Sequence, residues 1–563
     1  MSASKNSKAM DRRSFIGLLG LTGAGVAGAG MLGGCSPKAS NSDLAATGTA
    51  DATAGEGGKP SKAALGNEFA KDSYDIAETK TADLVVVGGG TAGAAAACRG
   101  AELDLRVILV EQADITGGTS IMTEGLFAVD SHWQKANGKN PADLGYDLFA
   151  KAMDYHHQLC DGHLLRMLMN DSAANIDWIE NTVGIKIAGT GTMCDNEYNT
   201  WHVYETYNDG SLSGAKYVDD WRGAMETLGV EILTSTKAID LEQAEDGAIQ
   251  AVICEAGAKY LRIETPAVVM ATGGYGDNPQ MVTDFTGMAE DKYISMGMGG
   301  RTGLGIAMAR AAGGKLADAP GTCMFYGGNL PGINYGTNLY CASAFQPLFW
   351  VNENGVRFIN EWYAERNFNF SGNGQSKQRK VISIVTQAQM DKMAAEGGWF
   401  GCGEYIHAGE PLTELWTEYQ DQLDAGNEYM WCADTLDEIA ELAGLPAEAL
   451  KEEVENYNAM CAAGKDTEFS KDPQYLIPLE SGPYYAFQLK TGFFTTVGGM
   501  KVNDNAQVLN EDNEPIVGLY AAGCDAGGLY GDSYDVSICE GSQQAWCVES
   551  GKLAAEHVAA NLV

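Results

Sequence analysis

Residues 82–111 read ADLVVVGGGTAGAAAACRGAELDLRVILVE, and this stretch decides the fold. The apolar run Leu84–Val87 predicts a buried parallel strand that leads directly into a glycine-rich turn. Small residues follow on a predicted helix, and residues 107–110 predict a second buried strand. This order of strand, helix and strand predicts an α/β fold with a Rossmann-like parallel sheet.

The turn after the first strand matches the pattern G-x-G-x-x-G. Gly88 permits the tight turn, Gly90 lets the backbone approach a pyrophosphate, and Gly93 lets the helix pack on the strand. Unpaired N–H groups at the start of the helix favour phosphate binding. Glu111 ends the second strand and can accept hydrogen bonds from ribose hydroxyls. An acid here favours an unphosphorylated ribose, so the pattern leaves FAD and NAD open.

Further motifs follow in a fixed order, namely GGTS (117–120), ATGGYGDNP (271–279), GVRFINE (355–361), GPYYA (482–486) and GLYAAG (518–523). With the glycine-rich turn, they resemble the flavoprotein superfamily of fumarate reductases and 3-ketosteroid dehydrogenases. This superfamily includes exported gut-bacterial alkene reductases such as the cardiac glycoside (digoxin) reductases. The resemblance implies bound FAD, an FAD-binding domain in two sequence segments, and an α+β capping domain inserted between them.

The first 35 residues resemble an export signal. Arg12 and Arg13 precede a glycine-rich apolar stretch that is too short for a lasting transmembrane helix, as in twin-arginine signals. The segment ends in LGGC, which resembles a lipobox whose Cys35 would be lipidated. An uncleaved anchor, or an ordinary signal with an incidental cysteine, is the alternative. We expect export to the outer face of the cytoplasmic membrane, with a lipid anchor at Cys35.

The rest of the chain divides into four predicted parts. Residues 36–79 are rich in Ala, Gly, Ser, Thr and Lys without an apolar period, which predicts a flexible linker. The resemblance then implies a first FAD-binding segment at 80–325, a capping domain at 326–490 and a second FAD-binding segment at 491–563. Substrate would bind where the cap closes over the flavin.

The resemblance also assigns cofactor contacts to residues of this chain. They are Gly88, Gly90, Thr91, Ala92, Gly93, Glu111, Gly118, Thr119, Ser120, Ala238, Ala271, Thr272, Gly273, Gly274, Gly523, Asp525 and Ser542. One departure concerns the residue after AAG, where the family often has an acid. This chain has Cys524 there, and Asp525 comes one position late.

Reduction of an activated C=C bond needs a hydride donor, a group that grips the conjugated oxygen, and a proton donor. Fumarate reductases of this superfamily grip two carboxylates with His and Arg. At the matching positions this chain has Phe493, Phe494, Tyr530 and Tyr534, and residues 381–390 hold no arginine. A dianion would remain unpaired in such a site, so the sequence argues against fumarate as substrate.

The candidate catalytic residues are mainly phenolic. Tyr534 and Gly541 resemble the tyrosine and glycine that hold a substrate carbonyl in ketosteroid dehydrogenases, and Tyr485 is a second candidate. A tyrosine hydroxyl can donate to a ketone, lactone or acid oxygen, or deliver a proton. Glu361 and Arg366 resemble the family's proton-delivery pair. The alternative is that they form a buried ion pair that braces the cap.

Composition limits the partners. The 37 Lys and Arg residues against 75 Asp and Glu give a net charge of −38, which argues against nucleic-acid binding. The 13 cysteines include no C-x-x-C pair and no haem-attachment motif, and no spacing of metal ligands stands out. Electrons must then come from another protein, and we expect a membrane-bound multihaem cytochrome or quinol oxidase.

These observations predict an exported FAD-dependent reductase of activated C=C bonds that serves as a respiratory electron sink. The expected substrates are enones, unsaturated lactones or aryl-acrylate acids. A 3-ketosteroid dehydrogenase, which runs the reverse hydride transfer, is the first alternative. A fumarate- or urocanate-type reductase with shifted clamps is the second. A non-enzymatic flavin carrier is disfavoured, because a carrier needs no substrate-capping domain.

Overall fold

The computed structural model describes residues 70–71, 73–138, 143–192, 198–206, 213–403 and 405–563. The predicted export signal with Cys35, and residues 36–69 and 72 of the predicted linker, lie outside the described residues. The linker ends earlier than the predicted residue 79, because a strand begins at Ile76 and pairs with the first FAD-binding segment. Within the described ranges, no helix is both long and apolar enough to cross a membrane.

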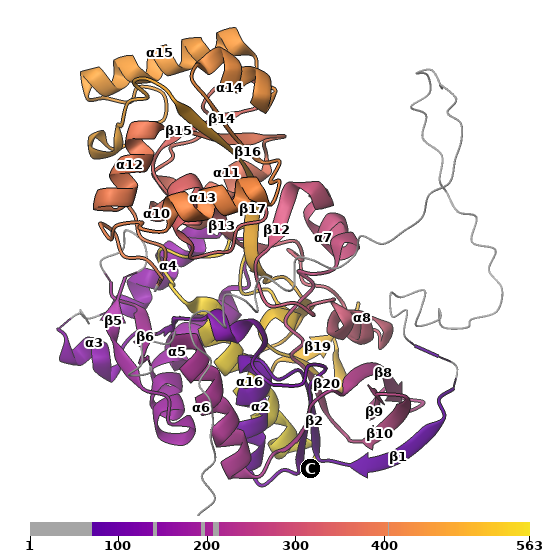
Figure 1. The fold of residues 1–563 in the computed structure, drawn as a ribbon. Coiled ribbons are helices and arrows are strands. Elements are labelled where there is room, and N and C mark those ends of the chain that lie inside the picture. Colours follow the sequence, from indigo (N-terminus) through magenta and orange to yellow (C-terminus); the bar gives the residue numbers. More distant parts are fainter. Residues whose placement is uncertain (1–69, 72, 139–142, 193–197, 207–212, 404) are drawn as a thin grey trace, which may run out of the picture.

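A six-stranded sheet forms the base of the molecule (Figure 1). Its order is β19 (Gln507–Leu509), β20 (Pro515–Ala521), β11 (Val268–Met270), β2 (Leu84–Val87), β3 (Val107–Val110) and β7 (Glu231–Leu233). All pairs are parallel except β19 with β20. The predicted α/β fold with a parallel sheet is therefore confirmed, and the C-terminal strand β20 completes a sheet begun more than 400 residues earlier.

Helices α2 (Thr91–Glu102) and α16 (Ser542–Asn561) pack closely against each other beside this sheet. Small residues make the contact possible. A Cβ atom on Gly551 would lie 2.4 Å from the Ala92 carbonyl oxygen, and one on Gly93 would lie 1.9 Å from the Gly88 oxygen. Gly93 therefore has the packing role that the sequence predicts for it. Helices α5 (Gly162–Trp178) and α6 (Ser213–Leu228) pack against α16 and α2, respectively.

Two smaller sheets flank the base. The four-stranded one consists of β1 (Ile76–Thr81), β10 (Lys259–Glu264), β9 (Ile249–Ala256) and β8 (Lys237–Gln243). The three-stranded one consists of β4 (Gly125–Phe127), β6 (Trp201–Tyr204) and β5 (Ile187–Gly191). The nearby short elements are α3 (His132–Ala136), α4 (Leu144–Tyr155), α7 (Pro279–Thr286), α8 (Leu304–Ala311), β18 (Met500–Lys501) and β21 (Ala526–Gly527).

The upper part of Figure 1 is built around the 13-residue strand β17 (Tyr484–Thr496). Its first half pairs with β15 (Val381–Thr386) and β16 (Met430–Ala433), and β15 pairs with β14 (Phe349–Asn352). Its second half pairs with β12 (Tyr293–Ser295) and β13 (Cys323–Asn329). The predicted boundary at residue 490 thus falls within one continuous strand.

Helices surround this upper sheet, and the last two of them, α14 and α15, form a second apolar core against it. They are α9 (Asn338–Ala344), α10 (Tyr363–Arg366), α11 (Phe368–Ser376), α12 (Gln387–Glu396), α13 (Leu415–Asp424), α14 (Leu436–Ala443) and α15 (Ala447–Ala463). The predicted stripe Leu450, Val454 and Tyr457 on α15 is buried in this core against the sheet, so its role is packing.

Candidate active site

A cleft of about 980 Å³ lies at the carboxyl ends of strands β2, β3 and β11, between the base and the upper part. Residues that directly follow these strands line it, including Gly88, Glu111 and Ala271. Ala522 and Cys524, just after β20, line it as well. Ligands of open α/β sheets bind at this edge, which makes the cleft the candidate active site.

The glycine-rich turn offers a place for a pyrophosphate. Gly88 has φ +104°, and a Cβ atom there would lie 2.3 Å from the Ala271 carbonyl oxygen, so glycine is required. A Cβ on Gly90 would meet no protein atom closer than 3.6 Å, so this glycine leaves open space in the cleft. The N-cap residue of α2 is Gly90 itself, which has no side chain to cap the helix. This glycine N-cap and the open turn fit the diphosphate of a dinucleotide.

Glu111 lies where a ribose would bind. Its two carboxylate oxygens accept hydrogen bonds from the backbone N–H groups of Gly89 and Ala113, each at 2.8 Å. A carboxylate has further lone pairs for ribose hydroxyls. Ala238, at the start of β8, lines the same end of the cleft, as predicted for an adenine contact.

Ser120 links the predicted GGTS contacts to the phosphate turn. Its Oγ accepts hydrogen bonds from the Thr91 backbone N–H at 3.1 Å and the Thr91 hydroxyl at 2.9 Å. The hydroxyl of Thr119 accepts from the Met298 N–H at 3.1 Å. Ala92 and Gly118 line the cleft beside them. The remaining predicted contacts that line the cleft are Thr272 and Gly273.

Asp525 supports the cofactor loop from behind instead of lining the cleft. Its carboxylate accepts hydrogen bonds from the Thr272 N–H at 2.6 Å, the Thr272 hydroxyl at 2.8 Å and the Gly274 N–H at 2.9 Å. Burial raises the pKa of Asp525, and these hydrogen bonds oppose that rise. Among the predicted contacts, Gly93, Gly274, Gly523 and Ser542 also lie outside the lining. Cys524 faces the cleft where the family often has an acid.

The part of the cleft nearest the upper sheet is lined by an aromatic cage, defined here as Tyr326, Tyr335, Phe345, Phe368 and Phe494. The Tyr326 ring stacks on Phe345 at 5.1 Å between centroids and meets Phe494 edge-on at 5.2 Å. The hydroxyls of Tyr326 and Tyr335 lie 2.8 Å apart. Burial raises both tyrosine pKa values well above the ordinary range, so the cage stays uncharged.

The charged groups of the cleft do not suit a dianion. Of the described residues that line it, Lys237 and Arg301 carry permanent positive charges, and Lys237 lies at the adenine end. Arg301 is held by Asp277, with its Nη2 2.8 Å from Asp277 Oδ1. Glu124 and Glu365 contribute carboxylates to the lining. Glu365 is adjacent in sequence to Arg366, a predicted catalytic residue.

Tyr534 and Gly541 both line the cleft, so the structure brings this predicted pair to one site. The Tyr534 oxygen accepts hydrogen bonds from the Gln543 backbone N–H and the Ser542 hydroxyl. The Ser542 oxygen in turn lies 2.9 Å from the Tyr530 hydroxyl. Burial raises the pKa of Tyr534, which keeps its proton in place. A side chain at Gly541 is excluded, because its Cβ would lie 2.9 Å from the Leu126 backbone.

Three predicted catalytic residues do not line the cleft. Glu361 is fully buried and forms a bidentate pair with Arg357, at 2.8 Å for each oxygen, and lies 3.3 Å from Lys471 Nζ. Its partners are therefore Arg357 and Lys471, which corrects the predicted pairing with Arg366 and favours the bracing alternative. The Arg366 guanidinium lies over the Trp362 ring at 4.6 Å. Tyr485 donates a hydrogen bond to Gln387 within the upper part.

Sequence reasoning identified Phe494 on the substrate side but missed the other four residues of the aromatic cage and the acids Glu124 and Glu365. The cage residues come from β13, the segment after it, the end of α9, the start of α11 and β17. They share no motif and no spacing, since they meet only after the upper sheet folds. The segment that includes Arg366 was predicted to lie at the active site, and its neighbour Glu365 does line the cleft.

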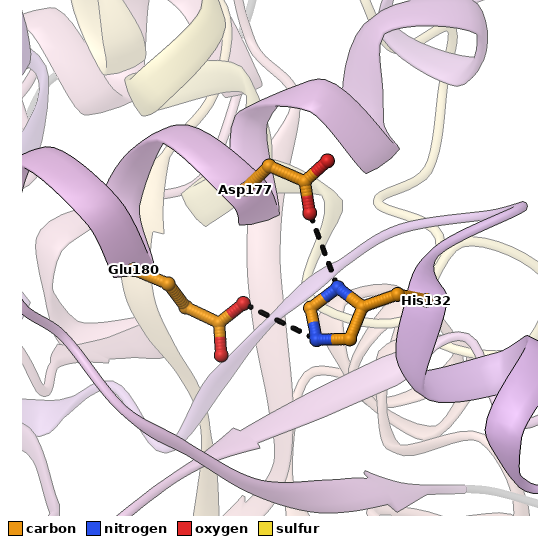
Figure 2. Close-up of side chains that lie close together, drawn as sticks. All are labelled: His132, Asp177 and Glu180. Carbon is orange, nitrogen blue, oxygen red and sulfur yellow. Dashed lines mark hydrogen bonds and ion pairs between the residues drawn. The ribbon is translucent and has the colours of Figure 1, made fainter.

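A separate polar cluster lies on the surface, formed by His132, Asp177 and Glu180 (Figure 2). The His132 Nδ1 lies 3.1 Å from Asp177 Oδ1, and its Nε2 lies 3.5 Å from Glu180 Oε2. The imidazole thus connects α3 to the end of α5 through both ring nitrogens. These contacts account for the arrangement as a surface ion-pair cluster when His132 is protonated.

Residues 83–536 match the family model described as an FAD binding domain, so the chain belongs to this family of FAD-binding proteins. It is similar to the vinyl phenol reductase of Lactiplantibacillus plantarum, with 37% identity over 86% of this chain and 97% of that protein. The digoxin reductase of Eggerthella lenta is 25% identical over 92% of each chain. A flavocytochrome c3 fumarate reductase structure has the same fold, with a TM-score of 0.62, 24% identity, and coverage of 86% of this chain and 79% of that one.

The protein is therefore an FAD-dependent oxidoreductase of the type that acts on CH–CH groups. The predicted superfamily and the predicted cofactor are both confirmed. The residues described above fit FAD, with the turn at Gly88–Gly90 for its diphosphate and Glu111 for its ribose.

Replacement of Asp525 by Ala tests how the cofactor loop is held. The change removes the acceptor for three buried donors, and we expect FAD affinity to fall about 10- to 100-fold, equivalent to about 1.4–2.8 kcal/mol. The dissociation constant of FAD, measured by flavin fluorescence, checks this. Asp504→Ala changes an exposed turn of the same C-terminal segment and is the matched control. Unchanged FAD affinity in the Asp525 variant would contradict the assigned role.

Proposed function

We propose that the protein is a reductase of activated C=C bonds in uncharged or singly charged substrates that carry an aromatic or other flat ring system. The aromatic cage is the observation that carries this proposal, because it offers flat apolar surfaces, while Asp277 already holds Arg301, the cation of the described lining outside the adenine end. Likeness to a vinyl phenol reductase and a digoxin reductase supports it, since vinyl phenol and digoxin are unsaturated and uncharged at neutral pH. Conjugated aryl alkenes, enones and unsaturated lactones are the proposed substrates.

Bound FAD supplies the hydride that reduces the alkene. The residues of the chain have three tasks. The cage holds the flat substrate and excludes water from the site. Glu124 and Glu365 provide acceptors that suit a substrate hydroxyl and repel a second carboxylate. Tyr534 points toward the cleft as the proton or hydrogen-bond donor.

The hydrogen bonds of Tyr534 support this last role. Its oxygen accepts two hydrogen bonds, from the Gln543 N–H and from Ser542, so its own proton is left for a group in the cleft. The Tyr530 hydroxyl lies 2.9 Å from Ser542 Oγ, and Ser542 also interacts with Tyr534. The three hydroxyls therefore form a buried polar cluster beside the cleft, with Tyr534 as the member that lines it.

A 3-ketosteroid dehydrogenase is the alternative that a specific observation favours. Tyr534 and Gly541 lie together in the cleft, as expected for a pair that holds a ketone oxygen. The flat cage also suits a steroid ring. A fumarate-type activity is less well supported, because fumarate is a dianion and Asp277 already neutralises Arg301.

A substrate screen under anaerobic conditions distinguishes these activities. With a reduced viologen as donor, we expect fast dye oxidation with a vinyl phenol, a cinnamate, an enone steroid or a cardenolide, and slow oxidation with fumarate. The comparison runs each substrate at equal concentration against FAD-loaded enzyme. Turnover with fumarate alone would refute the substrate class. Saturated 3-ketosteroid oxidation with an artificial acceptor would instead favour the dehydrogenase.

Replacement of Tyr534 by Phe tests the donor. We expect kcat to fall about 100-fold or more with little change in FAD content, because general acid catalysis contributes factors of that size. Tyr485→Phe is the matched control, since Tyr485 lies outside the cleft, and its kcat should stay near the original value. Equal rates for the Tyr534 variant and the unchanged enzyme would exclude this tyrosine from proton delivery.

We further propose that the enzyme is exported and lipid-anchored at Cys35, and that it accepts electrons from a membrane-bound multihaem cytochrome or quinol oxidase as a respiratory sink. The Arg12-Arg13 pair and the LGGC sequence support this proposal. Replacement of Cys35 by Ser should move the protein from the membrane fraction to the soluble fraction of cells. Retention in the membrane would refute the lipid anchor, and efficient turnover with NADH alone would refute the separate donor.

A further inference from the structure

Two cysteines face the cofactor cleft. Cys524 lies in the short helical turn Gly523–Asp525 after β20, and Cys547 lies in the second turn of α16. Of the described cysteines, these two line the cleft. Neither belongs to a motif, because they are 23 positions apart in sequence and the fold alone brings them together.

The two thiols lie close together, because one side-chain amide contacts both sulfurs. The Gln543 side-chain amide nitrogen lies 3.4 Å from Cys524 Sγ and 3.8 Å from Cys547 Sγ, and so bridges both. A Cβ atom on Gly523 would lie 3.0 Å from Cys547 Sγ, so glycine at that position leaves room for the second thiol.

The pair is also asymmetric in its chemistry. The hydrogen bond from Cys547 lowers the pKa of the Cys524 thiol against the effect of burial, and the Thr495 hydroxyl, 3.3 Å from Cys524 Sγ, adds to this. The same contact raises the pKa of Cys547 well above its ordinary value. The interaction thus lowers the pKa of one thiol and raises that of the other, and such asymmetry is typical of reactive dithiols.

We propose that Cys524 and Cys547 form a redox-active pair that exchanges two electrons with the bound FAD. In the oxidation, the two S–H bonds are lost and one S–S bond forms between Cys524 and Cys547. The two electrons and two protons pass to oxidised FAD, which becomes the reduced cofactor. The reverse step restores both thiols and oxidised FAD. The pair thereby stores a second pair of electrons beside the flavin.

This role accounts for a departure noted in the sequence. The acid that the family often has after AAG is replaced by Cys524, and the neighbouring Asp525 holds the cofactor loop from behind. A thiol in the cleft at this point is within the space that the cofactor occupies, because Thr272 and Gly273 line the same wall. The Cys524 sulfur therefore lies in the cleft whose residues fit FAD.

A reductive titration of the FAD-loaded protein tests the pair. After anaerobic oxidation with ferricyanide and removal of the oxidant, we expect full reduction to consume twice the equivalents that FAD alone requires. Cys524→Ser and Cys547→Ser should consume only the FAD equivalents. Cys432→Ser, which changes an exposed cysteine of β16 outside the cleft, should behave as the unchanged protein.

Thiol counting supplies a second readout that does not depend on turnover. Ferricyanide should remove two titratable thiols from the denatured unchanged protein and from Cys432→Ser, and peptide mapping should find Cys524 joined to Cys547. This measurement also holds if a serine variant binds FAD poorly, because it is made on the unchanged chain. Uptake of the FAD equivalents alone, with both thiols retained after oxidation, would overturn the proposal.

Discussion

The Asp525 carboxylate joins parts of the chain that are about 250 residues apart, and the cofactor site depends on it. Its hydrogen bonds to Thr272 and Gly274 fix the loop after β11 against the segment after β20. Without this carboxylate, strand β20 would still pair with β11. The backbone N–H groups of Thr272 and Gly274 in the loop after β11 would then lose their hydrogen-bond acceptor. Buried backbone N–H groups require partners, so the carboxylate fixes both the fold and the wall of the cleft at once.

The base of the molecule could be predicted from the sequence because its determinants are local. The strand, the turn at Gly88–Gly93 and the acid at Glu111 lie within 30 consecutive residues, and each has a steric or hydrogen-bonding reason. Most of the expected cofactor contacts line the cleft for the same reason. Asp525 was expected as a contact but supports the loop from behind, because the one-residue shift after AAG turns Cys524 toward the cleft instead.

The substrate side could not be predicted in the same way. Residues such as Tyr326, Phe368 and Phe494 come from separate elements, and no periodicity connects them. Glu361 was predicted to take part in proton delivery because its motif resembles the family's proton-delivery segment. In the structure it belongs instead to a buried ion cluster with Arg357 and Lys471. A buried carboxylate requires cationic partners that compensate for the loss of its hydration. The spacing of a motif does not reveal partners such as Lys471, which is distant in sequence.

Strand β17 changes its partners near residue 490, from the upper sheet to β12 and β13. A single backbone thus runs from the region that shapes the substrate side to the wall that faces the cofactor, where Phe494 and Thr495 line the cleft. The upper sheet and the cofactor wall are therefore joined through the backbone of one strand, so a change in the register of β17 would displace the residues on both sides of the cleft together.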